Sequence, residues 1–169
     1  MNKALLVIDV QNDYFADGKF PLWNAETVSE NVEKAVRRAK DNDIPLIYIQ
    51  HVVKQEQAPF FGEETPGVEI NSRILAAAPD APIIVKQNAD SFQGTTLEEV
   101  LNKLDVTELL VCGMMTHNCV THTAISKSAE KYAITVLPDC CTTVSEIIHL
   151  LALDALSNRV KLIPSTKAL

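Results

Sequence analysis

Short runs of aliphatic and β-branched residues alternate with stretches of helical periodicity along the whole chain. This alternation is typical of an α/β fold in which helices cover both faces of a parallel sheet, giving three layers, α/β/α. Six strands are predicted, over residues 5–8, 45–52, 83–85, 109–112, 134–137 and 160–163. Because 169 residues are near the usual size of one domain, we expect a single domain over residues 1–169.

Two segments carry an apolar stripe at helical spacing. The first begins near Glu26, and its stripe is expected to pack against the sheet. The second covers residues 144–156, with Asn158 available to end it. Its stripe consists of Val144, Ile147, Ile148, Leu151 and Leu156. Residues 54–67 are rich in Gln, Glu, Pro and Gly, which predicts a long surface loop.

Charge and cysteine content narrow the classes of protein. With 15 basic and 22 acidic residues and no cluster of Lys or Arg, nucleic acid is not an expected partner. No apolar segment is long enough for a membrane span or a signal peptide, so we expect a cytoplasmic protein without membrane contact. The cysteines form no CxxC pair, which favours free thiols over disulfides or a thiolate zinc site. They are Cys112, Cys119, Cys140 and Cys141.

Polar residues follow three of the predicted strands directly or after a short turn. Asp9 follows the first strand, Lys86 the third, and a glycine-containing turn leads from the fourth to Cys119. The carboxyl ends of parallel strands meet at one edge of a sheet, where ligands usually bind. The sequence therefore predicts that a carboxylate, an ammonium and a thiol converge at this edge.

The convergence is typical of nucleophilic catalysis. A helix is predicted to run from Cys119 to Ala129, and its start together with Lys86 would lower the pKa of the thiol. Asp9 would accept the thiol proton while Lys86 keeps the carboxylate ionised. The alternatives are a cysteine that only packs in the core and a structural ion pair at the sheet edge.

Three segments in this order and spacing resemble the isochorismatase-like cysteine hydrolase family. They are Asp9–Phe15 (DVQNDYF), Lys86 followed by Ser91–Thr95 (SFQGT), and Gly113–Val120 (GMMTHNCV). The resemblance extends from Leu5 to about Asp139, which is most of the chain.

The resemblance implies a six-stranded parallel sheet of order 3-2-1-4-5-6 and a Cys-Asp-Lys triad of Cys119, Asp9 and Lys86. It also implies a non-proline cis peptide between Met114 and Met115, with the backbone amides of Met115 and Cys119 directed at an oxyanion. Family members typically cleave the C–N bond of a small amide, ureide or carbamoyl compound through a thioester acyl-enzyme.

Other functions remain open. Isochorismatases cleave a vinyl ether and can lack the cysteine, so the presence of Cys119 favours amide chemistry. A catalytically inert binding subunit of the same fold is a second alternative. A nucleotide-binding domain is disfavoured because the chain has neither GxGxxG nor a GK[ST] turn.

The chain departs from the nicotinamidases of this family after the second strand. Those enzymes carry an Asp-x-His metal motif, whereas this chain has Ile49-Gln50-His51. A lone histidine is a poor metal site, so His51 is interpreted as a structural or pocket residue, and neither metal nor cofactor is expected.

Several residues on loops near the same edge are candidates for contact with a small-molecule substrate. Gln11 would orient a carbonyl or pin its loop, and the aromatic candidates would bind substrate or pack in the core or against a second subunit. We accordingly expect a homo-oligomer, a dimer or higher. The candidates are Gln11, Phe15, Trp23, Phe60, Phe61 and His117.

Overall fold

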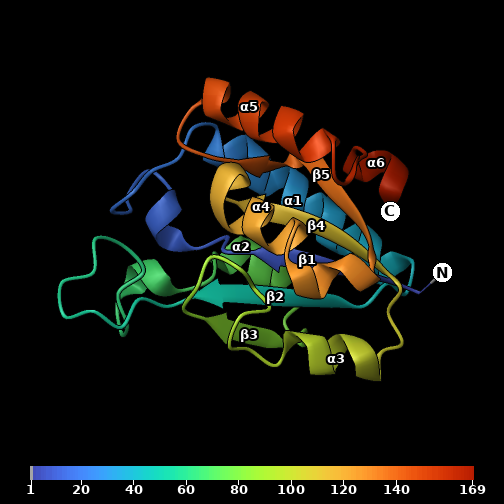
Figure 1. The fold of residues 1–169 in the computed structure, drawn as a ribbon. Helices are drawn as coiled ribbons and strands as arrows, with labels where there is room; N and C mark the ends of the chain where they lie inside the picture. The colour runs from blue at the N-terminus through green and yellow to red at the C-terminus, as the bar shows by residue number, and fades with distance from the viewer. Residues whose placement is uncertain (1) are drawn as a thin grey trace.

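A parallel sheet of six strands forms the centre of the computed structural model, which describes residues 2–169 (Figure 1). The order β3-β2-β1-β4-β5-β6 confirms the predicted arrangement. The strands are β1 (Lys3–Ile8), β2 (Leu46–His51), β3 (Ile83–Lys86), β4 (Glu108–Met114), β5 (Ala133–Thr142) and β6 (Lys161–Leu162). Because β5 is longer than predicted, Cys140 and Cys141 lie within this strand and not after it.

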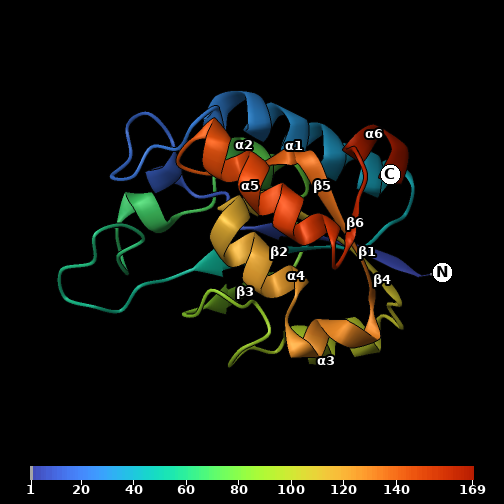
Figure 2. The ribbon, with the colours of Figure 1, turned by 45° about the horizontal axis from the view of Figure 1, so that its top comes forward.

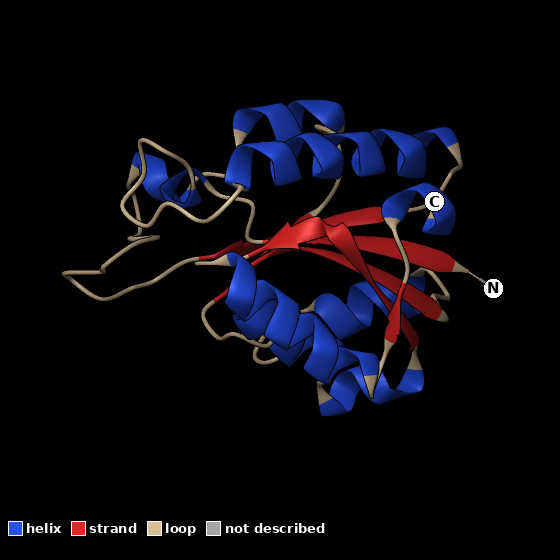
Figure 3. Cartoon of the chain, turned by 90° about the horizontal axis from the view of Figure 1, so that it is seen from above, coloured by secondary structure: helices blue, strands red, loops and turns tan. Residues whose placement is uncertain are grey.

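Helices cover both faces of the sheet, as expected for three layers (Figure 3). One face carries α1 (Ala25–Asp41), α2 (Ser72–Ala77) and α6 (Ser165–Ala168). The other carries α3 (Leu97–Lys103), α4 (Thr121–Ala124) and α5 (Glu146–Ser157). No helix of the described chain combines the length and apolarity that crossing a bilayer would require.

The core lies along the two central strands. Every residue of β4 is buried, and the five residues after Lys3 in β1 are buried too. Strands buried on both faces read as continuous apolar runs, which is why β1 and β4 were visible in the sequence. The predicted stripe of α1 packs on this core through Val28, Val32, Ala35, Val36 and Ala39.

The apolar residues of α5 behave differently from those of α1. Ile147, Leu150 and Leu151 are 71%, 57% and 64% exposed, and only His149 and Leu156 of this helix are buried. The reason is the narrow surface beneath α5, which packs on the two-residue edge strand β6, the end of β5 and the turn after β4. Most of its predicted stripe therefore faces away from the sheet.

The carboxyl ends of the strands lead into irregular segments on one side of the molecule. Residues 54–67 form the predicted loop, which projects at the left of Figures 1 and 2. A bridge between Val53 and Gly62 closes most of this loop, and its last two residues begin the short 3-10 helix η2 (Pro66–Val68). A second 3-10 helix, η1 (Asn12–Tyr14), contacts η2 from the segment after β1.

Candidate active site

Asp9 is the first residue beyond β1, and its side chain is fully buried. Its backbone is left-handed, with φ at 51°, which turns the chain out of the sheet. The neighbouring strand passes unusually close here, because a Cβ at Gly113 would lie 2.0 Å from the carbonyl oxygen of Ile8. Only glycine fits this position, whose φ of 120° also disfavours other residues.

Lys86 ends β3 with a fully buried side chain, as the sequence predicted for the carboxyl edge. Its Nζ lies 3.1 Å from Asp9 Oδ2, which makes a buried ion pair. The ammonium also donates hydrogen bonds to the carbonyl oxygens of Asn88 and Ala89, at 2.8 and 3.3 Å, and lies 3.2 Å from His51 Nδ1. The structure thus brings the predicted acid and cation together.

The Asp9 carboxylate has a counter-charge in Lys86 but no geometric hydrogen-bond donor among the described residues. Both of its oxygens are buried, and neither accepts a hydrogen bond from the described residues. The ion pair with Lys86 is short, but its geometry is not that of a hydrogen bond. Buried carboxylates are normally hydrogen-bonded, so an unpartnered one is a candidate for function.

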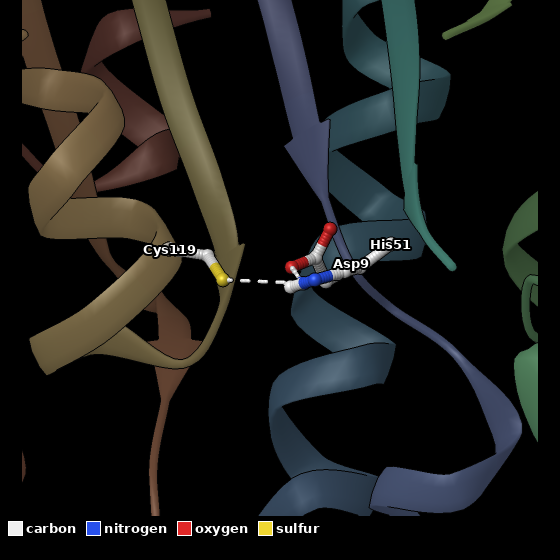
Figure 4. A group of neighbouring side chains, drawn as sticks. All are labelled: Asp9, His51 and Cys119. Carbon is white, nitrogen blue, oxygen red and sulfur yellow. Dashed lines mark hydrogen bonds and ion pairs between the residues drawn. The ribbon is translucent and has the colours of Figure 1, made fainter. Parts of the chain in front are cut away.

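Cys119 is brought to the same place from the turn after β4. It lies in the π-helix η3 (Thr116–Val120), and its Sγ is 3.7 Å from His51 Nδ1. A carboxylate oxygen of Asp9, a ring nitrogen of His51 and the Sγ of Cys119 all lie within 4.8 Å of one another (Figure 4). The thiol, carboxylate and ammonium therefore converge, as predicted from three separate parts of the chain.

The local structure around Cys119 differs from the predicted helix over residues 119–129. Cys119 is the fourth residue of η3 and not the start of an α-helix, and α4 is only four residues long. Ser126 has an extended backbone, with φ −55° and ψ 145°, and it separates α4 from the 3-10 helix η4 (Lys127–Lys131). Its hydroxyl donates a hydrogen bond to Asp90, which holds the interruption in place.

The expectation of a lowered thiol pKa is also wrong. Burial raises the pKa of Cys119 above its ordinary value, and the negative charge of Asp9 raises it further. Lys86 acts in the opposite direction, but its effect is smaller than that of burial. The resting residue is therefore a thiol and needs a base that removes its proton.

His51 has a more central place than the sequence suggested. It ends β2, its ring nitrogen Nδ1 is close to Lys86, Asp9 and Cys119, and 15% of its side chain is exposed. The strand order contains the missed signal: β2 lies between β1 and β3, and His51 pairs in register with Lys86. A polar residue at the end of β2 is therefore a neighbour of both Asp9 and Lys86.

Asp9, His51 and Cys119 offer oxygen, nitrogen and sulfur atoms of the types that bind Zn²⁺. However, the Lys86 ammonium is within about 3 Å of two of these atoms. A divalent cation bound there would face a buried positive charge at very short range. The charge balance of the cluster thus fits a protonated lysine better than a metal.

The predicted cis peptide between Met114 and Met115 is present. The backbone N–H of Met115, which follows it, donates to no acceptor within residues 2–169. Met115 is itself only 6% exposed. An unused backbone donor therefore lies in a buried position four residues before Cys119.

Gln11 acts as a clamp on β2. Its Nε2 donates to the carbonyl oxygens of His51 and Val68, at 2.9 and 2.7 Å, and its Oε1 accepts from the N–H of His51 at 2.8 Å. Because the side chain is fully buried and its amide is occupied, the structure favours the loop-pinning alternative over contact with substrate.

The aromatic candidates fall into two groups. Phe60 and Phe61 pack with Tyr14, and the Phe61 ring is centred 6.1 Å from that of His51. Trp23 and His117 lie elsewhere, at the end of β5. There the backbone N–H of Trp23 donates to the Thr143 carbonyl, and His117 Nδ1 lies 2.6 Å from the Thr143 hydroxyl.

Exposure separates these candidates further. Phe15 and Phe61 are 7% and 0% exposed, as core residues are, whereas Trp23 is 36% exposed. Phe60 is half-buried and His117 is exposed. Phe61 therefore packs near His51, and Phe60 packs against Phe61.

A cavity of about 480 Å³ lies far from this cluster. It is formed by the carboxyl ends of α1, α2 and α3 and by the start of β2, including Leu46 and Leu104. Since Cys119 and Asp9 lie at the opposite edge of the sheet, this cavity is not part of the candidate active site.

Comparisons with known proteins agree with this fold and these motifs. An isochorismatase domain matches residues 3–167. An uncharacterized isochorismatase family protein of Bacillus subtilis, YddQ, is 38% identical over 145 residues, covering 86% of this chain and 80% of that protein. Nicotinamidase 3 of Arabidopsis thaliana is 28% identical over 158 residues, covering 86% and 76%.

A solved structure gives the same picture. The chain resembles an isochorismatase-like hydrolase from Alkaliphilus metalliredigens with a TM-score of 0.90 and 25% identity, over 99% of this chain and 97% of that one. The family match spans nearly all residues, and the sheet order is the one that the resemblance implied. This chain therefore belongs to the isochorismatase family of hydrolases.

Proposed function

We propose that this chain is a cysteine hydrolase that cleaves the C–N bond of a small amide, ureide or carbamoyl compound through a thioester. The observation that carries the proposal is the buried Asp9 carboxylate, which accepts no hydrogen bond from residues 2–169 and lies beside the Cys119 thiol. A relative named as a nicotinamidase, at 28% identity, supports an amide as the substrate class.

In the first half of the reaction, Asp9 takes the Cys119 proton as Sγ attacks the substrate carbonyl carbon. The carbonyl electron pair moves to oxygen, and the backbone N–H groups of Met115 and Cys119 donate hydrogen bonds to this oxyanion. Asp9 then returns the proton to the leaving nitrogen. The C–N bond breaks, the amine departs, and a thioester remains on Cys119.

In the second half, water attacks the thioester carbonyl while Asp9 accepts one of its protons. The C–S bond breaks, the acid product departs, and the proton on Asp9 restores the thiol. Lys86 remains protonated throughout, and its charge keeps Asp9 ionised while partly offsetting the negative charge that moves between carboxylate and sulfur.

Access to the sulfur favours small substrates. Cys119 is 1% exposed, and His51 is the most exposed member of the cluster. A substrate would approach past the His51 ring, next to Phe60 and Phe61, and a small local movement would have to open the last part of the path.

The test is a screen of small primary amides, ureides and carbamoyl compounds, followed by release of ammonia or amine. Cys119→Ala should abolish turnover of any substrate found, whereas Cys140→Ala, which removes another buried thiol, should retain it. Turnover by Cys119→Ala at the wild-type rate would refute the mechanism. Turnover of none of these compounds, with an unreactive Cys119, would favour an inert binding subunit.

A further inference from the structure

We infer that His51 is a positioning residue that keeps the Asp9 carboxylate free to accept the Cys119 proton. The inference rests on the proposed function and assigns a role to a side chain outside the proposed triad. It follows from the way the hydrogen bonds of the buried Lys86 ammonium are distributed.

An ammonium has three N–H groups and accepts no hydrogen bond. Three atoms meet the geometry for a hydrogen bond to Lys86 Nζ: His51 Nδ1 and the carbonyl oxygens of Asn88 and Ala89. Asp9 Oδ2 is as close, at 3.1 Å, yet it receives none of the three. His51 thus occupies the donor that would otherwise turn to Asp9.

This distribution affects the basicity of Asp9. A hydrogen bond to the charged form of a carboxylate stabilises it and makes it a weaker base. Because His51 takes the third N–H, Lys86 supplies Asp9 with charge but leaves its lone pairs available. The carboxylate can then accept the proton of the Cys119 thiol, which burial keeps protonated.

The arrangement also defines the state of the imidazole. Since Lys86 only donates, His51 Nδ1 is the acceptor of this contact, which places a ring proton on Nε2. The ionisable side chains around this ring are Asp9 after β1, Lys86 on β3 and Cys119 on η3. The Tyr14 phenol lies near Asp9 and Cys119, and burial together with their charges raises its pKa, which keeps it neutral.

The backbone of His51 is fixed by the clamp described above. Gln11 binds both the N–H and the carbonyl oxygen of His51 through one buried side chain. Gln11 therefore has a function near the site, because it sets the position from which the His51 ring reaches Lys86.

Two substitutions separate the acceptor from the rest of the side chain. In His51→Asn, the amide oxygen can take the place of Nδ1 and accept from Lys86. In His51→Leu, a side chain of similar reach offers no acceptor, so the free N–H of Lys86 turns to Asp9. Only a role as acceptor predicts that asparagine rescues what leucine loses.

The experiment follows alkylation of Cys119 by iodoacetamide as a function of pH, with peptide mapping to identify the modified thiol. We expect His51→Leu to slow alkylation by about tenfold at pH values where the thiol is protonated, because a carboxylate that accepts from Lys86 is a weaker base for the thiol proton. His51→Asn should react within about twofold of the wild-type rate. Thermal unfolding of each variant establishes that it is folded.

The results distinguish this inference from the proposed function. Equal alkylation rates for all three proteins, or an equal loss of rate in both variants, would overturn the role of His51 as acceptor. If Cys119→Ala loses turnover while His51→Leu keeps the wild-type profile, the hydrolase proposal survives and the role of His51 fails. If Cys119→Ala keeps turnover, the proposed function itself fails.

Discussion

Two buried aspartates four positions apart show two different uses of a carboxylate. Asp13 is 2% exposed, and its oxygens accept hydrogen bonds from the N–H groups of Lys19 and Phe61, at 3.0 and 2.7 Å. Asp9 is equally buried, but its oxygens accept none from the described chain. One carboxylate joins two loops, and the other remains available for chemistry. Burial alone therefore does not distinguish a structural acid from a reactive one, whereas hydrogen bonding does.

The largest expected effect is the loss of activity in Asp9→Asn. An amide cannot accept the thiol proton, so kcat should fall by about a thousandfold. The change also leaves the buried Lys86 ammonium without its counter-charge, which should lower the free energy of unfolding by about 3 kcal/mol. Steady-state kinetics and denaturant unfolding measure the two effects.

A double variant separates the two effects of Asp9→Asn. Adding Lys86→Met removes the unpaired charge, so stability should recover to a large extent while activity stays lost. Recovery of activity in the double variant would show that Asp9 serves only to balance the charge of Lys86.

For Asp13→Ala we expect a loss of stability with little change in the reactivity of Cys119. Two charge-assisted hydrogen bonds to backbone N–H groups are lost, so the free energy of unfolding should fall by about 2–4 kcal/mol. Alkylation of Cys119 should change by less than about tenfold, since Asp13 makes no contact with the thiol. A larger loss of thiol reactivity than of stability would erase the distinction between the two acids.

A matched pair of glycines tests the structural acid more gently. A Cβ at Gly67 would lie 2.1 Å from Asp13 Oδ1, so Gly67→Ala must displace this carboxylate. At Gly62 the nearest atom to a Cβ is a methyl carbon of Thr65 at 3.4 Å, an ordinary contact. We expect Gly67→Ala to cost about 2 kcal/mol and Gly62→Ala less than about 0.5 kcal/mol, measured by denaturant unfolding. Equal costs would show that the Asp13 contacts contribute little.

The smallest effect concerns a buried thiol beside a hydrogen-bonded aspartate. Burial raises the pKa of Cys140 from 9.0 to about 12, and Asp139, which is bonded to Ser165, adds to the increase. A thiol whose pKa is higher in the folded state contributes stability that is full below pH 9 and is lost as the pH rises toward the folded value. Wild-type stability should therefore fall between pH 9 and 11.

The control for this alkaline effect is Cys140→Ala. Its loss of unfolding free energy between pH 8 and pH 10 should be smaller than that of the wild type by about 1 kcal/mol. Parallel pH dependences of the two proteins would contradict the raised pKa of Cys140.

Much of the site was predictable because strand ends are visible in the sequence. Asp9, Lys86 and Cys119 come after apolar runs, and parallel strands bring the positions at their carboxyl ends to one edge. His51 was underestimated because its neighbours depend on strand order and on the register of β2 with β3. Gln11 follows a strand in the same way, but only the folded structure reveals that its amide binds backbone groups.

Two other features could not be predicted from the local sequence pattern. The π-helix that contains Cys119 has no distinctive sequence signature, so an ordinary helix start was predicted and with it a lowered thiol pKa. In α5 the periodicity was visible, but it does not reveal how much sheet lies beneath the helix. Ile147 and Leu151 are exposed because β6 is too short to cover them.

The central claim is that Cys119 is the nucleophile and Asp9 its base, and trapping the acyl-enzyme tests it most directly. Wild-type protein is mixed with a substrate from the amide screen, quenched in acid during turnover, and analysed by peptide mass spectrometry. We predict that the mass of the acyl group appears on the peptide containing Cys119, and that Asp9→Asn fails to accumulate it. Sustained turnover with no acyl group on Cys119, or with the acyl group on another residue, would contradict it.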